Sequence, residues 1–258
     1  MVLAIAGGRN CRGGAVTGSV GTTTGAAGGG HGGLSAAGPS WLAQTGTRYA
    51  PSQERPGPAS GVEKKLPTAL AALLTPSAVR GRSVRLLFQD EARFGRMVRI
   101  RRCWSPAPFR PTVANGYERE FVYVYGAVSP QQGELDWMIC REMNTPRMGQ
   151  FLTQVSQTHA DEFLIMVVDG ASSHKSRDLV IPENIRLLPL PAYSPELNPQ
   201  EHVWDELREK QFPNRVFEHL DTVTHQLKQG LQRLTHDAPT LRSLTNWPWI
   251  NSLILKAN

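Results

Sequence analysis

Six consecutive apolar residues that end on an acid, FLIMVVD at residues 163–169, constrain the fold of this chain more than any other stretch. The run is far too short to span a bilayer and has the length of a strand. A strand without polar alternation usually lies in a sheet that is covered on both faces. We therefore expect an α/β fold.

Three strands are predicted ahead of this one. Residues 84–90 (VRLLFQD) form a strand-length apolar run, and residues 98–104 (VRIRRCW) alternate between apolar and basic side chains. Residues 121–128 (FVYVYGAV) are β-branched and aromatic, as strand residues tend to be. Because their connections are short, these strands predict an antiparallel meander.

The rest of the chain alternates helix and strand. Thr145 and Pro146 supply an N-cap and a first-turn proline, and a strand at 185–191 leads into a helix that begins near Pro199. Apolar residues at helical spacing mark two helices: Met148, Phe151, Leu152 and Val155 in the first, and Val223, Leu227, Leu231 and Leu234 in the second. A three-strand meander followed by alternating helices and strands is the order of a ribonuclease-H-like fold.

Residues 1–60 have a different composition. Of the 24 glycines, 13 lie in residues 1–40, and the first acidic residue is Glu54. Such a segment buries too little apolar surface to offset its ordering entropy, so we expect a disordered, low-complexity N-terminal segment. The break in composition also motivates the hypothesis that this segment is translated from a non-native reading frame.

The remaining chain divides into a helical lead-in at 61–82 and the ribonuclease-H-like domain at 83–258. Ala and Leu dominate the second half of 61–74, which looks helical with Pro67 near its start. Outside residues 1–60 the chain has 24 basic and 21 acidic residues, a mildly basic balance that permits nucleic acid as a partner without requiring it.

Cysteine usage and hydropathy indicate the compartment. Cys11, Cys103 and Cys140 are widely spaced and form no CxxC pair, so neither a disulfide framework nor a zinc site is expected. With no candidate membrane span, we expect a soluble cytoplasmic protein.

Asp90 and Asp169 both follow apolar strand residues with the same period-2 parity as the residues that face the core. An unpaired carboxylate there is costly. With Glu201 at the start of a later helix, they predict an oxygen-only site for Mg²⁺, with Mn²⁺ as an alternative. Two such ions activate water and stabilise the leaving oxygen of a phosphodiester.

Structural roles compete with this interpretation. An Asp at a strand end commonly makes turn or capping hydrogen bonds. Asn198, Pro199 and Glu201 also fit the N-cap, N1 and N3 positions of a capping box.

Three segments, FQDEARFGR, VVDGASSHKS and PLPAYSPELNPQEHVWDELREK, resemble the DDE (Asp-Asp-Glu) catalytic domain of bacterial insertion-sequence transposases in the mariner superfamily. The 31 residues between Asp169 and Glu201 are near the short separation of that superfamily. The resemblance covers about residues 84–250. It implies a ribonuclease-H-like fold, two Mg²⁺ ions, and DNA strand cleavage and strand transfer.

By this resemblance, Asp90, Asp169 and Glu201 are the three catalytic, metal-binding carboxylates. His174 recurs in the family motif and, with the adjacent Lys175, is a candidate DNA contact. Two other acids, Glu91 and Glu196, are set aside: the first has the opposite strand parity to Asp90, and the second lies in the turn before the helix.

An arginine-rich stretch after Asp90 is a second candidate DNA contact. Its guanidinium groups suit phosphate oxygens and would provide affinity without sequence specificity, although a solvated hairpin face explains the pattern as well. The residues are Arg93, Arg96, Arg99, Arg101 and Arg102.

Residues 1–50 contain no helix-turn-helix pattern of the kind that binds element ends in this family. The alternative function is therefore a truncated, inactive transposase remnant that binds DNA non-specifically. A host ribonuclease-H-like nuclease would leave the SPELNPQEHVW segment unexplained. The expected partner is DNA, both element ends and target, with nucleoid association when bound and no membrane partner. A homodimer is compatible with the resemblance, although the chain has no heptad pattern.

Overall fold

The computed structural model describes residues 62–97, 118–169, 178–190 and 194–255, together with the short stretches 42–43, 105–106, 108 and 112. The chain divides into two units. The first contains β1 (Leu42–Ala43) and β3 (Ser105–Pro106), which pair antiparallel. The expected disorder of 1–60 and the predicted strand at 98–104 lie outside the described residues, apart from β1. The second unit contains all three candidate acids.

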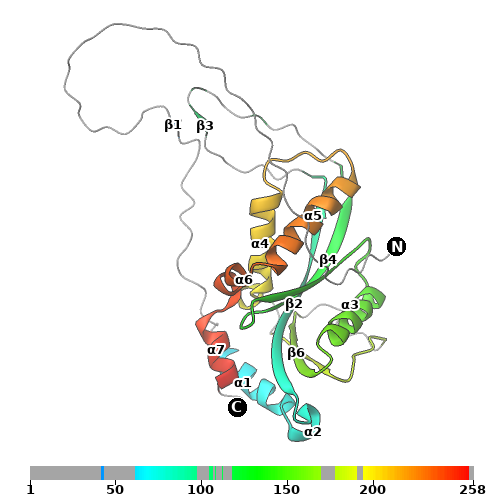
Figure 1. Cartoon of the computed structure of the whole chain (residues 1–258), viewed down its shortest axis with the longest axis vertical. Helices are drawn as coiled ribbons and strands as arrows, with labels where there is room; N and C mark the ends of the chain where they lie inside the picture. Colours follow the sequence, from blue (N-terminus) through cyan, green and yellow to red (C-terminus); the bar gives the residue numbers. More distant parts are fainter. Residues whose placement is uncertain are drawn as a thin grey trace, which may run out of the picture. The chain divides into compact units, whose positions relative to one another are not determined.

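A five-stranded sheet in the order β5-β4-β2-β6-β7 forms the centre of the second unit (Figure 1). Strands β2 (Ser83–Gly95), β4 (Phe121–Ser129) and β5 (Glu134–Cys140) make an antiparallel meander. Strands β6 (Glu162–Val168) and β7 (Ile185–Pro189) continue the sheet parallel to β2. This arrangement is ribonuclease-H-like, and it confirms the predicted fold class.

The meander differs from the prediction in its members. β2 pairs directly with β4, so β4 is the middle strand, and β5 is the third. The sequence ELDWMIC of β5 is not among the predicted strands, although its acids, Glu134 and Asp136, alternate with apolar residues as in a half-buried strand. Both acids have partners on other elements, and only the folded chain brings those partners close.

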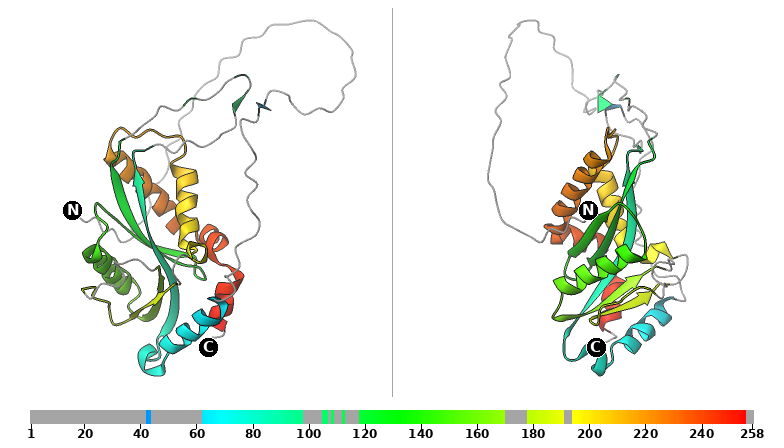
Figure 2. Two further views of the ribbon diagram at one scale, coloured as in Figure 1. Left: turned by 180° about the vertical axis from the view of Figure 1, so that it is seen from behind. Right: turned by 90° about the vertical axis from the view of Figure 1, so that its right-hand side faces the viewer.

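Helices cover both faces of the sheet, as the apolar β6 predicted (Figure 2). On one face, α3 (Thr145–Thr158) packs through the four predicted residues Met148, Phe151, Leu152 and Val155. On the other, which we call the α4–α5 face, lie α4 (Gln200–Gln211) and α5 (Leu220–Thr235). Alternate residues of β6 enter the two cores, and Phe163–Val168 are all buried.

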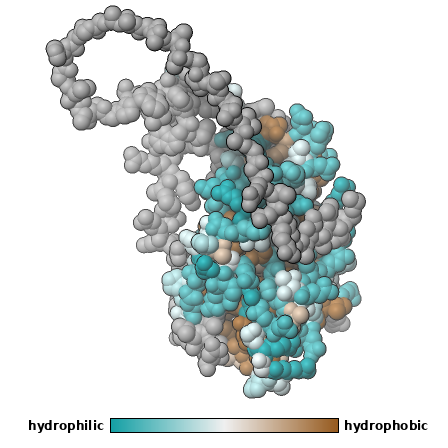
Figure 3. Space-filling view, viewed as in Figure 1, coloured by the Kyte–Doolittle hydropathy of each residue, from teal (hydrophilic) through white to brown (hydrophobic). Residues whose placement is uncertain are grey.

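Three further helices extend the α4–α5 face in the described part of the chain. They are α1 (Val62–Leu73), α6 (Ala238–Thr245) and α7 (Pro248–Leu255), while the short α2 (Pro76–Val79) leads into β2. The lead-in helix α1 starts earlier than predicted, so Pro67 lies inside it. None of the described helices is long and apolar enough to cross a membrane. The face of this unit that is visible in Figure 3 is mostly hydrophilic, with hydrophobic residues in separate patches.

One helix start was misplaced by a residue. The N-cap of α3 is Asn144 rather than Thr145, because the Asn144 side chain accepts a hydrogen bond of 3.0 Å from the Arg147 N–H.

Candidate active site

The register of the parallel strands brings Asp90 and Asp169 to the same level of the sheet. β2 and β6 pair in register up to Phe88 and Val167, and each aspartate lies two residues further along its strand direction. Phe88 and Val167 belong to the core beneath α4 and α5. Side chains two residues apart share a face, so both aspartates belong to the α4–α5 face.

Glu201 reaches this region because α4 is attached to β2 at its first turn. The Asn198 side chain donates a hydrogen bond of 3.0 Å to the carbonyl of Gln89, and its oxygen accepts one of 3.1 Å from the Gln200 N–H. The backbone N–H of Glu201 donates to the carbonyl of Asn198. The third acid of the predicted triad is therefore fixed, through its backbone, next to the strand that carries the first.

Asp90 is the most perturbed acid of the site. Its side chain lies in β2 and the residue is only 8% exposed. Burial, the negative charge of Glu201 and that of Glu91 raise the pKa of Asp90 to about 8, against the opposing effect of a hydrogen bond from Trp204. The indole N–H of Trp204 donates to Oδ2 of Asp90 at 2.9 Å. The Asp90 carboxyl is therefore held in place but disfavoured as an anion.

Glu201 is coupled to both aspartates. Burial raises the pKa of Glu201, Arg208 opposes that shift, and the charges of Asp205 and Asp169 add to it. Repulsion among negative groups that share a site is the electrostatic pattern of a cation site.

The capping alternative for Glu201 finds little support. The N-cap position of α4 is Pro199, which makes no side-chain capping bond. Asn198 binds the Gln200 N–H, and no hydrogen bond from the Glu201 carboxylate to another described residue is found. A capping box would need that carboxylate to bind the Asn198 N–H.

The three acids have the oxygen ligands that a hard cation prefers, but their side chains do not converge on one point. Oxygen-only carboxylate ligands are those that Mg²⁺ and Mn²⁺ prefer. Within the described ranges, however, no three His, Cys, Asp or Glu side chains are gathered closely enough to hold a metal ion. Side-chain adjustment would be needed for all three to bind at once.

The two acids set aside lie where the sequence placed them. Glu91 pairs with Tyr125, which belongs to the core under α3 and so to the opposite face from Asp90. Glu196 is exposed in the 3₁₀ turn Pro195–Leu197 before α4.

The predicted DNA contacts are described only in part. Arg93 is exposed, with its guanidinium carbon 5.1 Å from the centre of the Phe121 ring. Arg96 binds Glu120 at 2.8 Å and the carbonyl of Phe217 at 3.0 Å, so it ties β2 to the segment before α5. Five other predicted contacts lie outside the described residues: Arg99, Arg101, Arg102, His174 and Lys175.

Sequence reasoning missed the role of Trp204. No role in the site is predicted for Trp204 from the sequence; in the structure it lies on the apolar face of α4 and is 0% exposed. A buried indole N–H needs a hydrogen-bond acceptor, and this need is the one sequence signal that could have indicated a polar partner for Trp204. The partner, Asp90, lies 114 residues earlier in the chain.

Comparison with known proteins gives related results. A curated relative, the uncharacterized protein y4pE/y4sA of Sinorhizobium fredii (strain NBRC 101917 / NGR234), is 30% identical over 130 residues, 50% of this chain and 89% of the relative. Among solved structures, the Mos1 mariner paired end complex with Mn has a TM-score of 0.49 at 17% identity, covering 79% of this chain and 65% of that one.

Two further Mos1 structures are similar to this chain. The Mos1 Strand Transfer Complex has a TM-score of 0.47 at 17% identity, covering 84% of this chain and 66% of that one. The catalytic domain of Mos1 mariner transposase has a TM-score of 0.43 at 15% identity, covering 79% and 97%. This chain thus spans slightly less than two thirds of the Mos1 chains in the two complexes.

The family described as DDE superfamily endonuclease matches residues 85–224, which is more than half of the 258 residues and includes all three candidate acids. The chain belongs to the DDE superfamily endonuclease family.

Proposed function

We propose that this chain is a transposase catalytic domain that cleaves DNA strands and joins the freed end to target DNA with the help of divalent metal ions. The observation that carries the proposal is the electrostatic coupling of Asp90, Glu201 and Asp169 on one face of the sheet in a DDE endonuclease. Burial raises the pKa of Asp90 and of Glu201, so each is costly as an anion, and a bound cation would offset that cost.

Asp90, Asp169 and Glu201 would hold the metal, two Mg²⁺ ions or Mn²⁺ in their place. Such ions activate a water and stabilise the leaving oxygen of a phosphodiester, and the same arrangement lets a 3′-hydroxyl attack a second strand. In the chain itself, Trp204 orients Asp90, and Asn198 fixes the start of α4, the helix that carries Glu201.

DNA is the proposed partner, at element ends and target sites, and a homodimer that joins two ends is part of the proposal. Arg93 is exposed on β2 with the strand parity of Glu91, so its side chain leaves the sheet on the opposite face from Asp90, and it remains a candidate phosphate contact. Arg96 is engaged by Glu120 and Phe217, so it would contact DNA only through its remaining donors. Arg99, Arg101, Arg102, His174 and Lys175 remain candidate contacts, in a protein of the cytoplasm that associates with DNA.

The second candidate function is an inactive remnant that binds DNA non-specifically. The observation that favours it is the open arrangement of the acids, since no three of them in the described part of the chain are gathered for a metal.

The test is nicking of supercoiled plasmid DNA with Mg²⁺ or Mn²⁺ by wild type, Asp169→Ala and Asp161→Ala. Asp161 is an exposed acid in the turn before β6, so its loss changes the net charge equally but leaves the site intact. We expect Asp169→Ala to lose more than the ~10–100-fold that loss of a supporting partner of a metal ligand costs. Asp161→Ala should nick at the wild-type rate.

The outcomes separate the two candidates. Nicking that survives Asp169→Ala contradicts the catalytic assignment. A wild-type chain that binds DNA but never nicks it with either cation is the remnant.

A further inference from the structure

Three contacts hold the helix of the third candidate acid against β2, which carries the first, and against the neighbouring strand β4. They involve Trp204 and Asn198 on the α4 side and Gly126 on β4, and we call these three residues the clamp. Each is buried or lies in a buried strand: Trp204 is 0% and Asn198 is 3% exposed.

The first contact fixes one oxygen of Asp90. The Trp204 indole is rigid, fully buried, and donates to Oδ2 at 2.9 Å, so rotation of the carboxylate is restricted before any cation arrives. Pre-orienting a ligand in this way removes an ordering cost from binding. Oδ1 has no such bond from Trp204.

The second contact is the close approach of the Trp204 ring to the backbone at position 126, which has no side chain. Gly126 pairs directly with Asp90 across β2 and β4. A Cβ there would lie 2.5 Å from Cη2 of Trp204, 2.8 Å from its Cζ2 and 2.8 Å from Nε2 of Gln200. Only glycine leaves the space through which the Trp204 ring reaches Asp90.

The third contact fixes the helix. Asn198 binds the Gln89 carbonyl with its nitrogen and the Gln200 N–H with its oxygen, so one side chain joins the strand residue before Asp90 to the helix residue before Glu201. Movement of the start of α4 along β2 would break the bond to Gln89, whereas the bond to Gln200 holds the Asn198 side chain in position to make it.

We propose that Gly126, Asn198 and Trp204 are positioning residues that hold Asp90 and Glu201 in the arrangement from which they bind the divalent cation. This inference rests on the proposed function, since it assumes that the acids bind metal. The clamp residues touch neither substrate nor cation and act through Asp90 and Glu201.

The matched pair Trp204→Phe and Trp247→Phe tests the clamp. Both tryptophans are essentially unexposed, and both donate an indole hydrogen bond, Trp204 to Asp90 and Trp247 to the carbonyl of Leu244 at 3.0 Å. The two variants lose the same atoms from the same core. We expect both to lower the urea midpoint, and only Trp204→Phe to raise the Mg²⁺ concentration needed for half-maximal thermal stabilisation, by ~10–100-fold.

A second pair tests the space for the indole. Gly126→Ala should displace Trp204 and raise the same half-maximal concentration. Gly149→Ala is the control, because a Cβ on this α3 residue meets only Cδ1 of Leu179, at 3.9 Å.

A spectroscopic measurement on the unsubstituted chain covers the case in which a variant fails to fold. In protein labelled with ¹⁵N-tryptophan, the indole signal of Trp204 is the one that Trp204→Phe removes, or the one that remains after the other tryptophans are assigned. This signal should shift during Mg²⁺ titration. The signal of Trp247 should not shift, and Asp169→Ala should abolish the shift of Trp204.

These results separate a failure of the clamp proposal from a failure of the proposed metal-binding function. If Mg²⁺ stabilises wild type but not Asp169→Ala, and both tryptophan variants keep the wild-type half-maximal concentration or move equally, the clamp is refuted while the metal site stands. An indole of Trp204 that is indifferent to saturating Mg²⁺ refutes it too. If Mg²⁺ and Mn²⁺ have no effect on wild type, the metal site and the clamp fall together.

Discussion

At the scale of single residues, Asp90 loses most of its contact with water on folding and is buried near the negative charges of Glu201 and Glu91. Its folded pKa of about 8 lies above the ordinary value of 3.8, mainly because burial penalises the charged form. A group with a raised folded pKa contributes stability below its unfolded pKa and loses it as pH rises toward the folded value. The metal-free fold should therefore weaken from about pH 4 to about pH 8 through this group alone.

Asp90→Asn isolates that effect. Asparagine keeps an oxygen that can accept the hydrogen bond from Trp204 but carries no charge. In EDTA at pH 8, we therefore expect the free energy of unfolding of Asp90→Asn to exceed that of wild type by more than about 1 kcal/mol. The difference should shrink as the pH falls and become small near pH 3.5, where the folded aspartate is neutral and the unfolded one is mostly neutral. Urea unfolding at the two pH values measures it, with the exposed Asp161→Asn as the control. A variant that is weaker than wild type at pH 8 would contradict the electrostatic account.

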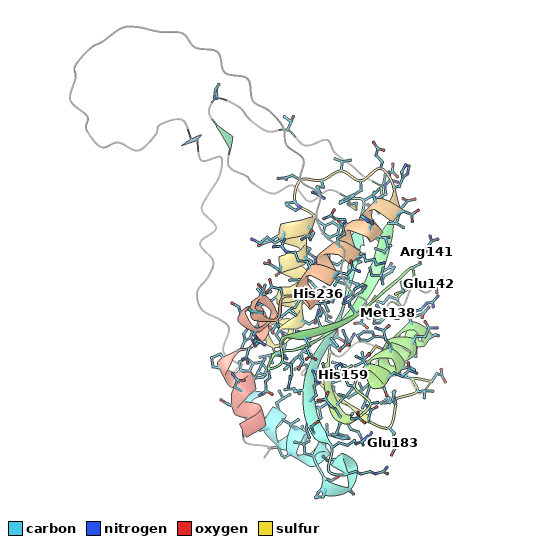
Figure 4. All side chains as sticks on the ribbon, viewed as in Figure 1. Met138, Arg141, Glu142, His159, Glu183 and His236 are labelled. Carbon is cyan, nitrogen blue, oxygen red and sulfur yellow. The ribbon has the colours of Figure 1, made fainter. Side chains whose placement is uncertain are left out.

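At the scale of elements, a charged network joins the N-terminal ends of β2, β5 and β6 to the end of α3. Arg85 on β2 binds Glu134 on β5 and Glu162 on β6. His159, which is labelled in Figure 4, follows α3 and contacts Asp136 at 2.9 Å and Glu162 at 3.3 Å. These ion pairs hold the ends of three strands in place.

The network makes stability depend on pH with a definite sign. The hydrogen bond to Asp136 raises the pKa of His159, so its contribution is complete below about pH 6.5 and is lost as pH rises through the folded pKa. The bond to Arg85 lowers the pKa of Glu162, so its contribution is present above about pH 4.5 and is lost as pH falls. Together they are complete between these two pH values.

His159→Gln tests the upper limit. We expect the stability advantage of wild type over this variant to be largest near pH 5.5 and to shrink as pH rises above 6.5, since only wild type loses a proton at this position. Urea titrations from pH 5 to pH 9 follow the difference. His225→Gln, an exposed position on α5, should leave the pH profile of wild type intact. An advantage that grows with pH would contradict the assignment.

At the scale of the whole unit, the core extends beyond the part that matches the family. The match ends at residue 224, yet Leu241 on α6, Ile250 on α7 and Trp247 between them are 0–1% exposed in the core of the α4–α5 face. Burying large apolar side chains is the main favourable contribution to folding. The last helices are therefore part of the fold that supports the site.

A chain that ends at Thr235 should lose cooperative thermal unfolding, because it lacks all three of these buried residues and leaves their partners open. Circular dichroism during heating measures the transition. A chain that ends at Leu255 keeps α6 and α7 and should unfold like the full chain. Cooperative unfolding of the shorter chain would show that α6 and α7 are dispensable.

The sequence determined the elements whose patterns are local. The apolar runs of β2 and β6, the β-branched and aromatic residues of β4, and the helical spacing in α3 and α5 predicted the ribonuclease-H-like order, because each pattern arises among residues that are neighbours in the sequence. β5 was not predicted as a strand. Its acids, Glu134 and Asp136, are paired with Arg85 and His159, which lie on other elements and come close only in the folded chain. The candidate acids came from parity and resemblance, and their metal-binding role remains a prediction.

What only the tertiary structure decided is how those acids are surrounded. That Trp204 donates to Asp90, that Gly126 makes room for it, and that Asn198 joins β2 to α4 depend on residues more than 70 positions apart in the chain. A hydrogen bond or a close approach of this kind follows from strand register and helix docking, which no local pattern encodes. Periodicity reports which side of an element is buried, whereas the partner on that side is set only when the elements pack.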